Sequence, residues 1–287
     1  MFENFGILFA LIALFGWAFG DFFIQKSTRV MGWYKTLFLI GAAGFVLLAP
    51  FALLSLPDTD ALVPLVLVSF IILIYAWAIF EALRVGKISV VESVVAIELP
   101  LTVGLAIFFG KDSLTLLQGI LFLIICAGIF LAATKDTNLF KHRKHWLEKG
   151  VLLACIGAFF SALTNFYVGE FSQTMSPLIV ILITHSMLAL ICAVYISLKF
   201  EWKQFAREIA QNRGTSVGTA VFDNAAWVGY AYATSLIPTS MVVTMTESYI
   251  ALAACLGWIF GHERLKRHQL IGAVIAFIGA GIFATTI

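Results

Sequence analysis

The chain has 287 residues, of which 61% are hydrophobic and only 12% are charged, against roughly 25% charged residues in an ordinary soluble domain. Its formal net charge is only +2, and its charged stretches are short. These figures exclude a nucleotide-binding cassette, a large extramembrane enzyme and a DNA-binding protein. They indicate a polytopic membrane protein.

Apolar segments long enough to cross a bilayer as α-helices, about 20 residues each, follow one another along the chain. They lack the alternating ten-residue pattern of a transmembrane β-barrel. The chain opens with Glu3 and without a clear cleavage site, which predicts a retained first helix. The ten predicted spans are 5–24, 34–55, 63–83, 88–109, 114–134, 149–169, 177–198, 215–235, 238–260 and 268–286. Pro100 lies inside the fourth span and is expected to kink it.

The last span of each half belongs to a repeated segment. The two copies are FFGKDSLTLLQGILFLIICAGIF, from residue 108, and IFGHERLKRHQLIGAVIAFIGAGIF, from residue 259. They align when 151 is added to the first numbering, so that Gln118 meets Gln269 and Gly128 meets Gly279. Three further matches lie in the same register, and the five together indicate a true repeat: Gly110 with Gly261, Asp112 with Glu263, and Leu114 with Leu265.

A weaker match extends the repeat to the first span of each half. An offset of 144 sets Asp21-Phe22-Phe23 against Asn165-Phe166-Tyr167. The chain therefore divides into a first half (1–134), a basic linker (135–148) and a second half (149–287). Because each half has five spans, an odd number, the halves are expected to be inverted in the membrane. The predicted fold is all-α, with ten transmembrane helices as two inverted five-helix repeats, a plan of secondary transporters.

The basic residues predict the orientation of the chain. All 18 Lys and Arg residues except Lys111 lie in or beside the loops after spans one, three, five, seven and nine. The positive-inside rule places these loops in the cytoplasm and both termini outside it, which predicts a multi-pass protein of the inner membrane. We interpret the Lys141-His142-Arg143-Lys144 cluster as a topology anchor near anionic lipid; a nucleic-acid site is the alternative.

The sequence offers little support for catalysis or for metal binding. Cys126, Cys155, Cys192 and Cys255 lie singly within apolar segments, as packing residues do. No G-x-S-x-G, H-E-x-x-H or P-loop motif is found in the sequence. We therefore expect no catalytic residue, no metal site and no cofactor, and we predict that the protein is not an enzyme.

Carboxyl groups inside the spans are the candidate binding groups, because one at a helix centre costs about 2.5 to 3.5 kcal/mol on insertion scales. Glu98, Asp223 and Glu247 lie near span centres and reach water only through a cavity. Four others lie near span ends, where snorkelling or pairing with Arg84 or Lys87 would satisfy them: Asp21, Glu81, Glu92 and Glu170.

Aromatic residues accompany these acids. Asp223, Trp227 and Tyr230 recur at spacings of four and three and share one helix face. Aromatic faces beside a carboxylate suit a cationic or zwitterionic amine. The candidate substrate- or proton-binding residues are Glu98, Glu247, Asp223, Asn224, Trp227, Tyr230, Tyr249, Trp17, Asp21 and His185. Contact with lipid is the alternative for Trp227 and Tyr249, and helix packing is the alternative for His185.

Two short motifs carry a resemblance to a known family. The first is Leu99-Pro100 followed by Gly110-Lys111-Asp112, and the second is Gly261-His262-Glu263-Arg264-Leu265 with Gln269 and Gly272. The chain resembles, over effectively its whole length, the EamA-type ten-helix members of the drug/metabolite transporter superfamily. The resemblance implies a carrier of small organic solutes such as amino acids, commonly an exporter. Such members are usually drawn with internal termini, opposite to the orientation that the charges predict.

Taken together, the sequence predicts a secondary transporter of a small amine-bearing or aromatic metabolite that works by alternating access. Its expected partners are the small-molecule substrate and the lipid bilayer, with no nucleic acid. Protons are a candidate coupling ion, and uniport is equally allowed. A broad multidrug cation exporter is the first alternative, followed by a membrane-embedded enzyme and a scaffold. Substrate identity, direction and oligomeric state are left open.

Overall fold

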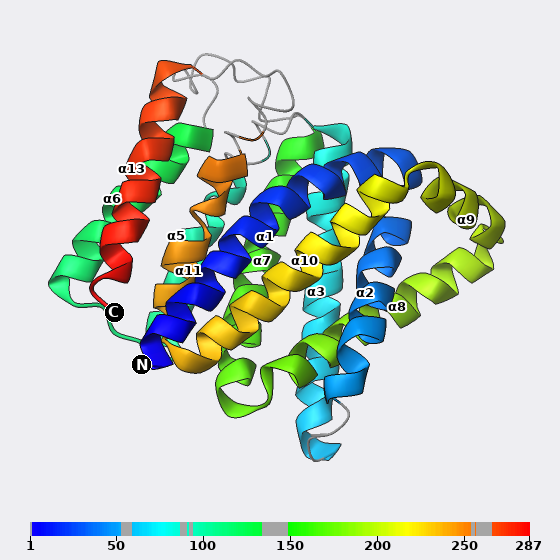
Figure 1. Cartoon of the computed structure of the whole chain (residues 1–287), viewed down its shortest axis with the longest axis horizontal. Helices are drawn as coiled ribbons and strands as arrows, with labels where there is room; N and C mark the ends of the chain where they lie inside the picture. Colours follow the sequence, from blue (N-terminus) through cyan, green and yellow to red (C-terminus); the bar gives the residue numbers. More distant parts are fainter. Residues whose placement is uncertain are drawn as a thin grey trace.

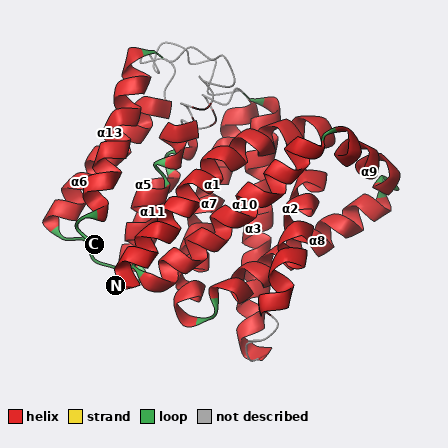
Figure 2. Cartoon of the chain, in the orientation of Figure 1, coloured by secondary structure: helices red, strands yellow, loops and turns green. Residues whose placement is uncertain are grey.

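The computed structural model describes residues 2–52, 59–86, 91, 94–133, 149–253, 256 and 266–287. Within these ranges the regular secondary structure is entirely α-helical (Figure 2). The helices are α1 (Phe2–Met31), α2 (Trp33–Ala52), α3 (Thr59–Val85), α5 (Glu98–Phe108), α6 (Leu116–Ala133), α7 (Lys149–Thr174), α8 (Pro177–Leu198), α9 (Trp202–Gln211), α10 (Arg213–Leu236), α11 (Thr239–Thr246) and α13 (Arg267–Ala284). Glu92, Cys255, the linker with its basic cluster and the segment 261–265 lie outside the described residues.

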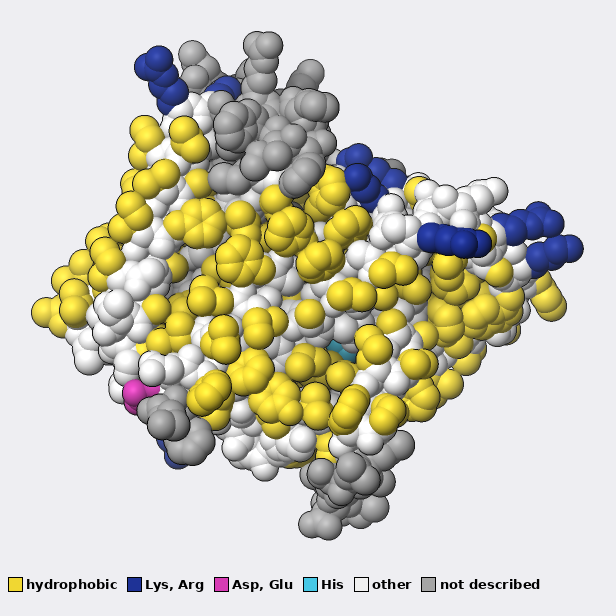
Figure 3. Space-filling model, in the orientation of Figure 1, with side chains coloured by type: hydrophobic (Ala, Val, Ile, Leu, Met, Phe, Trp, Pro, Cys, Tyr) yellow, Lys and Arg dark blue, Asp and Glu magenta, His cyan; other side chains and the backbone are white. Residues whose placement is uncertain are grey.

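Seven of the described helices are long and apolar enough to cross a membrane: α1, α2, α3, α6, α7, α8 and α13. Hydrophobic side chains cover the middle of the face seen in Figure 3, and Lys and Arg lie along its upper and right edges. The prediction of an all-α, multi-pass membrane protein is therefore confirmed. The predicted count of ten continuous spans is not reproduced. Within the described residues, three of the ten predicted spans do not form helices that are as long and as apolar as these seven.

Two of these three, spans 88–109 and 238–260, are interrupted at equivalent positions. The Ile97 N–H donates to the Val94 carbonyl at 3.1 Å, and the Ser248 N–H donates to the Met245 carbonyl at 3.3 Å. Both bonds reach back only three residues, and their residues differ by the repeat offset of 151. Pro100 follows the first interruption and lies in the first turn of α5, where its missing N–H does least harm. Glu98 and Glu247 thus lie beside breaks in the helices.

The third of these spans, 215–235, forms α10, a continuous helix that is less hydrophobic than the seven helices named above. This helix carries Asp223 and Asn224, and more than half of its residues are buried. It packs against α1, α2, α7 and α8. Asp223 and Asn224 are buried against these neighbours, whereas Val217 and Val221 are exposed, so the polar side chains are tolerated on the inner face of the helix.

Helix α1 is longer than predicted. It continues from Phe2 to Met31 instead of ending near residue 24, and Gly32 alone separates it from α2, with a left-handed φ of 83° that favours glycine. Asp21 therefore lies well inside a helix, and its placement near a span end was wrong. The polar residues after Asp21 belong to the same helix, because one end of α1 extends beyond the apolar stretch.

The helices pack in antiparallel pairs. Helix α1 lies along α10, α3 along α7, α2 against α8 and α6 against α13 (Figure 1). Glycines allow close approach: a β-carbon added at Gly16 would lie 2.7 Å from the Ala226 β-carbon. Within α3, Glu81 forms the expected ion pair with Arg84 at 2.7 Å. Cys126, Cys155 and Cys192 are free thiols.

Candidate substrate site

Four aromatic rings from three segments meet inside the bundle, and we call them the aromatic cluster. The ring of Trp17 on α1 lies 5.3 Å from that of Trp227, 5.4 Å from that of Tyr230 and 5.9 Å from that of Tyr249, measured between centroids. Trp227 and Tyr230 come from α10, and Tyr249 follows α11. Trp227 is only 6% exposed and Tyr249 only 8%. The alternative that these two residues face lipid is therefore wrong.

Asp21 lies one helical turn beyond Trp17 and joins this cluster to a group of acids. Its carboxyl group accepts a hydrogen bond from the Tyr249 hydroxyl. Asp21 lies within electrostatic range of both Asp223 and Glu98. Asp223 is buried, whereas Asp21 is partly exposed. Asp21 is thus the more accessible of the two.

Glu98, the first residue of α5, is bonded to the second half of the chain. Its Oε1 accepts a hydrogen bond of 2.5 Å from Asn165 Nδ2, and its carboxyl group also accepts one from Ser161. The Tyr230 hydroxyl in turn donates to the Asn165 carbonyl at 2.8 Å. Asn165 therefore connects the acid to the aromatic cluster.

Tyr75 on α3 shows that the acids share one region. It lies within electrostatic range of Glu98, Asp21, Asp223 and Glu247, and its side chain is partly exposed. Glu247 itself, at the turn after α11, is only 1% exposed. We call these four carboxyl groups the acidic cluster.

His185 and Asn224 lie elsewhere, at the junction of α2, α8 and α10. Asn224 Nδ2 donates to the Ile40 carbonyl at 3.0 Å and to the Ala220 carbonyl at 2.8 Å. A β-carbon at Gly44 would lie 3.2 Å from His185 Nδ1 and would also contact Asn224 Oδ1. Both side chains thus pack against α2, and the structure does not bring them into the aromatic cluster.

Three residues of the site were not among the predicted ones: Asn165, Ser161 and Tyr75. A signal for Asn165 was present, because the offset of 144 aligns it with Asp21. The hydrogen bond between Asp21 and Tyr249 is the repeat equivalent of the one between Asn165 and Glu98. Adding 144 converts Asp21 to Asn165, and adding 151 converts Glu98 to Tyr249. No comparable pattern in the sequence identifies Ser161 or Tyr75.

The chemistry of the site suits the binding of an organic cation. Among the described residues, no group of three or more His, Cys, Asp or Glu side chains is placed to hold a metal ion. Carboxyl groups beside aromatic faces attract an organic cation through charge and through the ring quadrupoles. Ionisable groups at the centre of a multi-pass helical bundle are typical of substrate and ion pathways in membrane proteins.

Comparisons with known proteins identify the family. The model of the EamA-like transporter family matches residues 4–134 and 148–285, one copy for each half. The chain belongs to this family, which is part of the drug/metabolite transporter superfamily, so the resemblance noted in the sequence is confirmed. A solved protein described as "Crystal structure of protein" has a TM-score of 0.73 and 15% identity, over 96% of this chain and 95% of that chain. At that identity the likeness shows the fold alone. No curated protein matches significantly.

Proposed function

We propose that this protein is a secondary transporter that carries a small amine-bearing or aromatic solute by alternating access, with the aromatic and acidic clusters as its substrate site. The observation that carries the proposal is that Tyr75 lies within electrostatic range of all four acids, Asp21, Glu98, Asp223 and Glu247. Carboxyl groups at membrane depth are costly, and both halves of the chain contribute to this group. Binding of a cationic solute accounts for their presence.

We also propose that the two halves are inverted repeats around this site. The equivalent helices α6 and α13 pack in antiparallel fashion. A β-carbon at Gly128 would lie 2.7 Å from the Ala276 nitrogen, and one at Gly279 would lie 2.9 Å from Ile125. These two contacts interchange under the offset of 151. Equivalent helices that run in opposite directions are expected of inverted repeats.

The glutamines of the repeat support the same relation. Gln118 Oε1 accepts the Thr115 N–H and its Nε2 donates to the Thr286 carbonyl. Gln269 Oε1 accepts the Lys266 N–H and its Nε2 donates to the Ala132 carbonyl. Each glutamine therefore caps its own helix and bonds to the chain near the end of the other.

For direction and orientation we propose export across the inner membrane, with both termini outside the cytoplasm. The distribution of Lys and Arg supports the orientation, and the family resemblance supports export. Whether protons drive the cycle or the solute moves by uniport is decided by measurement of uptake with and without a proton gradient.

Uptake into proteoliposomes tests the substrate class. Phenethylamine, phenylalanine and phenylacetate share a ring and differ in charge, and we expect the cation or the zwitterion to be carried in preference to the anion. Trp227→Phe is expected to raise the half-saturation concentration about fivefold, since a desolvated cation–π contact with Trp exceeds that with Phe by about 1 kcal/mol.

Trp77→Phe is the matched control, because Trp77 lies on α3 and is 37% exposed, outside the aromatic cluster. Preference for phenylacetate, or equal effects of Trp77→Phe and Trp227→Phe, would contradict the proposal. Uptake of bulky unrelated cations such as ethidium would instead favour the multidrug exporter.

A further inference from the structure

The segment between α8 and α10 contains a helix that the sequence did not predict. Helix α9 (Trp202–Gln211) lies at one end of the bundle, where α8 ends and α10 begins (Figure 1). Its one buried side chain, Phe205, packs on Phe38 with 5.5 Å between ring centroids. Helix α9 is therefore held against α2 through Phe205, and its other side chains are partly or fully exposed.

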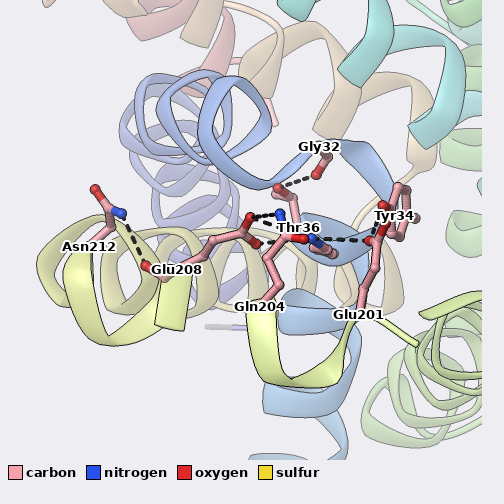
Figure 4. A network of polar contacts seen from close by, with 8 residues as sticks. Gly32, Tyr34, Thr36, Glu201, Gln204, Glu208 and Asn212 are labelled. Carbon is pink, nitrogen blue, oxygen red and sulfur yellow. Dashed lines mark hydrogen bonds and ion pairs between the residues drawn. The ribbon is translucent and has the colours of Figure 1, made fainter. Parts of the chain in front are cut away.

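The two acids of this segment also point inward. Lys35 on α2 is only 2% exposed, and its Nζ lies 3.1 Å from Glu201 and 3.1 Å from Glu208. The Tyr34 hydroxyl donates a hydrogen bond to Glu201 as well (Figure 4). We call Tyr34, Lys35, Glu201 and Glu208 the latch, because they tie α9 to the beginning of α2.

The latch keeps Glu201 ionised. Hydrogen bonds from Tyr34 and Lys35 lower the pKa of Glu201 below its ordinary value of 4.5. Both carboxylates of residues 198–213 are thus used within the protein. Because both acids pair with Lys35, they do not neutralise the Lys and Arg side chains on the outer surface of this segment.

Three of these cations form a basic face at the junction of α9 and α10. Lys203 and Arg207 are four residues apart, which places them on the same side of the helix, and Arg213 follows at the start of α10. All three are exposed, and within the described part of the chain no ion pair involves them. Lys and Arg side chains extend from this end of the molecule in Figure 3.

Apolar side chains lie next to the basic face. Phe200 is 92% exposed and is held in a left-handed backbone conformation, with φ of 57°; Leu198 and Trp202 are exposed as well. A short helix with cations on one face and large apolar residues beside it is typical of helices that lie at the membrane interface. Its position directly after the membrane span of α8 agrees with that depth.

We propose that the basic face, Lys203, Arg207 and Arg213, binds the headgroups of anionic phospholipids. Charge complementarity selects a phosphate-bearing lipid over a zwitterionic one, and the exposed apolar residues at this end provide contact with its acyl chains. Because the latch joins α9 to α2, and α10 carries Asp223 and Trp227, a bound lipid would steady helices that reach the substrate site.

Native mass spectrometry of the purified full chain tests this proposal with phosphatidylglycerol and phosphatidylcholine of identical acyl chains. We expect the wild type to retain phosphatidylglycerol preferentially. The triple variant Lys203→Gln, Arg207→Gln, Arg213→Gln should lose that preference, with roughly a fivefold loss of affinity per cation removed. Soluble glycerol phosphate should not compete, which separates lipid binding from binding of free phosphate.

Two controls make the result specific. Lys266→Gln with Arg267→Gln removes exposed cations at the start of α13 and should leave the preference unchanged. Lys203→Arg with Arg207→Lys and Arg213→Lys keeps the charge and should also keep it. Equal lipid preference in the Gln triple variant and the wild type, or an equal loss in the α13 variant, would overturn the proposal.

Discussion

Replacing Glu98 with Gln is expected to reduce uptake of a cationic solute by about tenfold to hundredfold. The substitution removes a group that can carry the negative charge with which a cationic solute pairs, and a hydrogen bond to a charged group contributes about 1.5–3 kcal/mol. Glutamine keeps an oxygen that can accept the Asn165 Nδ2 hydrogen bond, so the protein should still fold. Initial rates of uptake into proteoliposomes, with thermal unfolding of the same preparations, measure both effects.

Other acids of the chain provide the comparison for this variant. Glu81→Gln removes a carboxyl group that pairs with Arg84 at 2.7 Å and lies outside the acidic cluster, so its transport should resemble the wild type. Asp21→Asn and Glu247→Gln should behave like Glu98→Gln. Wild-type uptake by both Glu98→Gln and Glu247→Gln would remove the proposed roles of these residues.

The second large effect is expected when the latch loses both carboxylates. In the double variant Glu201→Gln, Glu208→Gln, Lys35 stays buried without a counter-charge, and removal of the partners of a buried ion costs about 3–5 kcal/mol of folding free energy. We expect a value near the lower bound, since the side chain of Glu201 is 25% exposed and is partly screened by solvent. Unfolding by denaturant in a neutral detergent measures the loss.

A further substitution identifies the cause. Lys35→Met, added to the double variant, should restore most of the lost stability, because an apolar side chain of similar length needs no counter-charge. If the double variant is as stable as the wild type, or if Lys35→Met makes it less stable still, the latch does not have the role described here.

The latch also predicts how stability changes with pH. The pKa of Glu201 is lowered by its hydrogen bonds with Tyr34 and Lys35. Its contribution is therefore complete above the ordinary value of 4.5 and is lost as the pH falls through the lowered value. The Glu201→Gln variant should therefore lose this part of the dependence of stability on acid pH.

The fold could largely be predicted from hydrophobic patterning and from the repeat, but the helix interruptions could not. Pro100 gave a signal for the first one. The second, at Ser248, has neither proline nor glycine beside it in the sequence. No local pattern therefore marks it, although its position is equivalent to that of the first interruption under the repeat offset of 151.

The site could be predicted in part for a similar reason. The spacing of Asp223, Trp227 and Tyr230 placed them correctly on one face, since a helical period depends only on neighbouring residues. Asp21 was misplaced because the predicted span ended with the apolar stretch, near residue 24, whereas α1 continues through polar residues to Met31. The position of Tyr75 depends on how α3 packs against its neighbours, which no local pattern encodes.

Labelling of a cysteine at position 75 tests most directly whether the central clusters form an alternately accessible substrate site. In a chain with its four native cysteines replaced, Tyr75→Cys should react with a membrane-impermeant thiol reagent applied from either side of oriented vesicles, and the transported amine should slow the reaction. Leu67→Cys on the same helix, 62% exposed on its outer face, should stay unreactive. Reaction of position 75 from one side only, or at a rate that the amine does not change, would contradict the account.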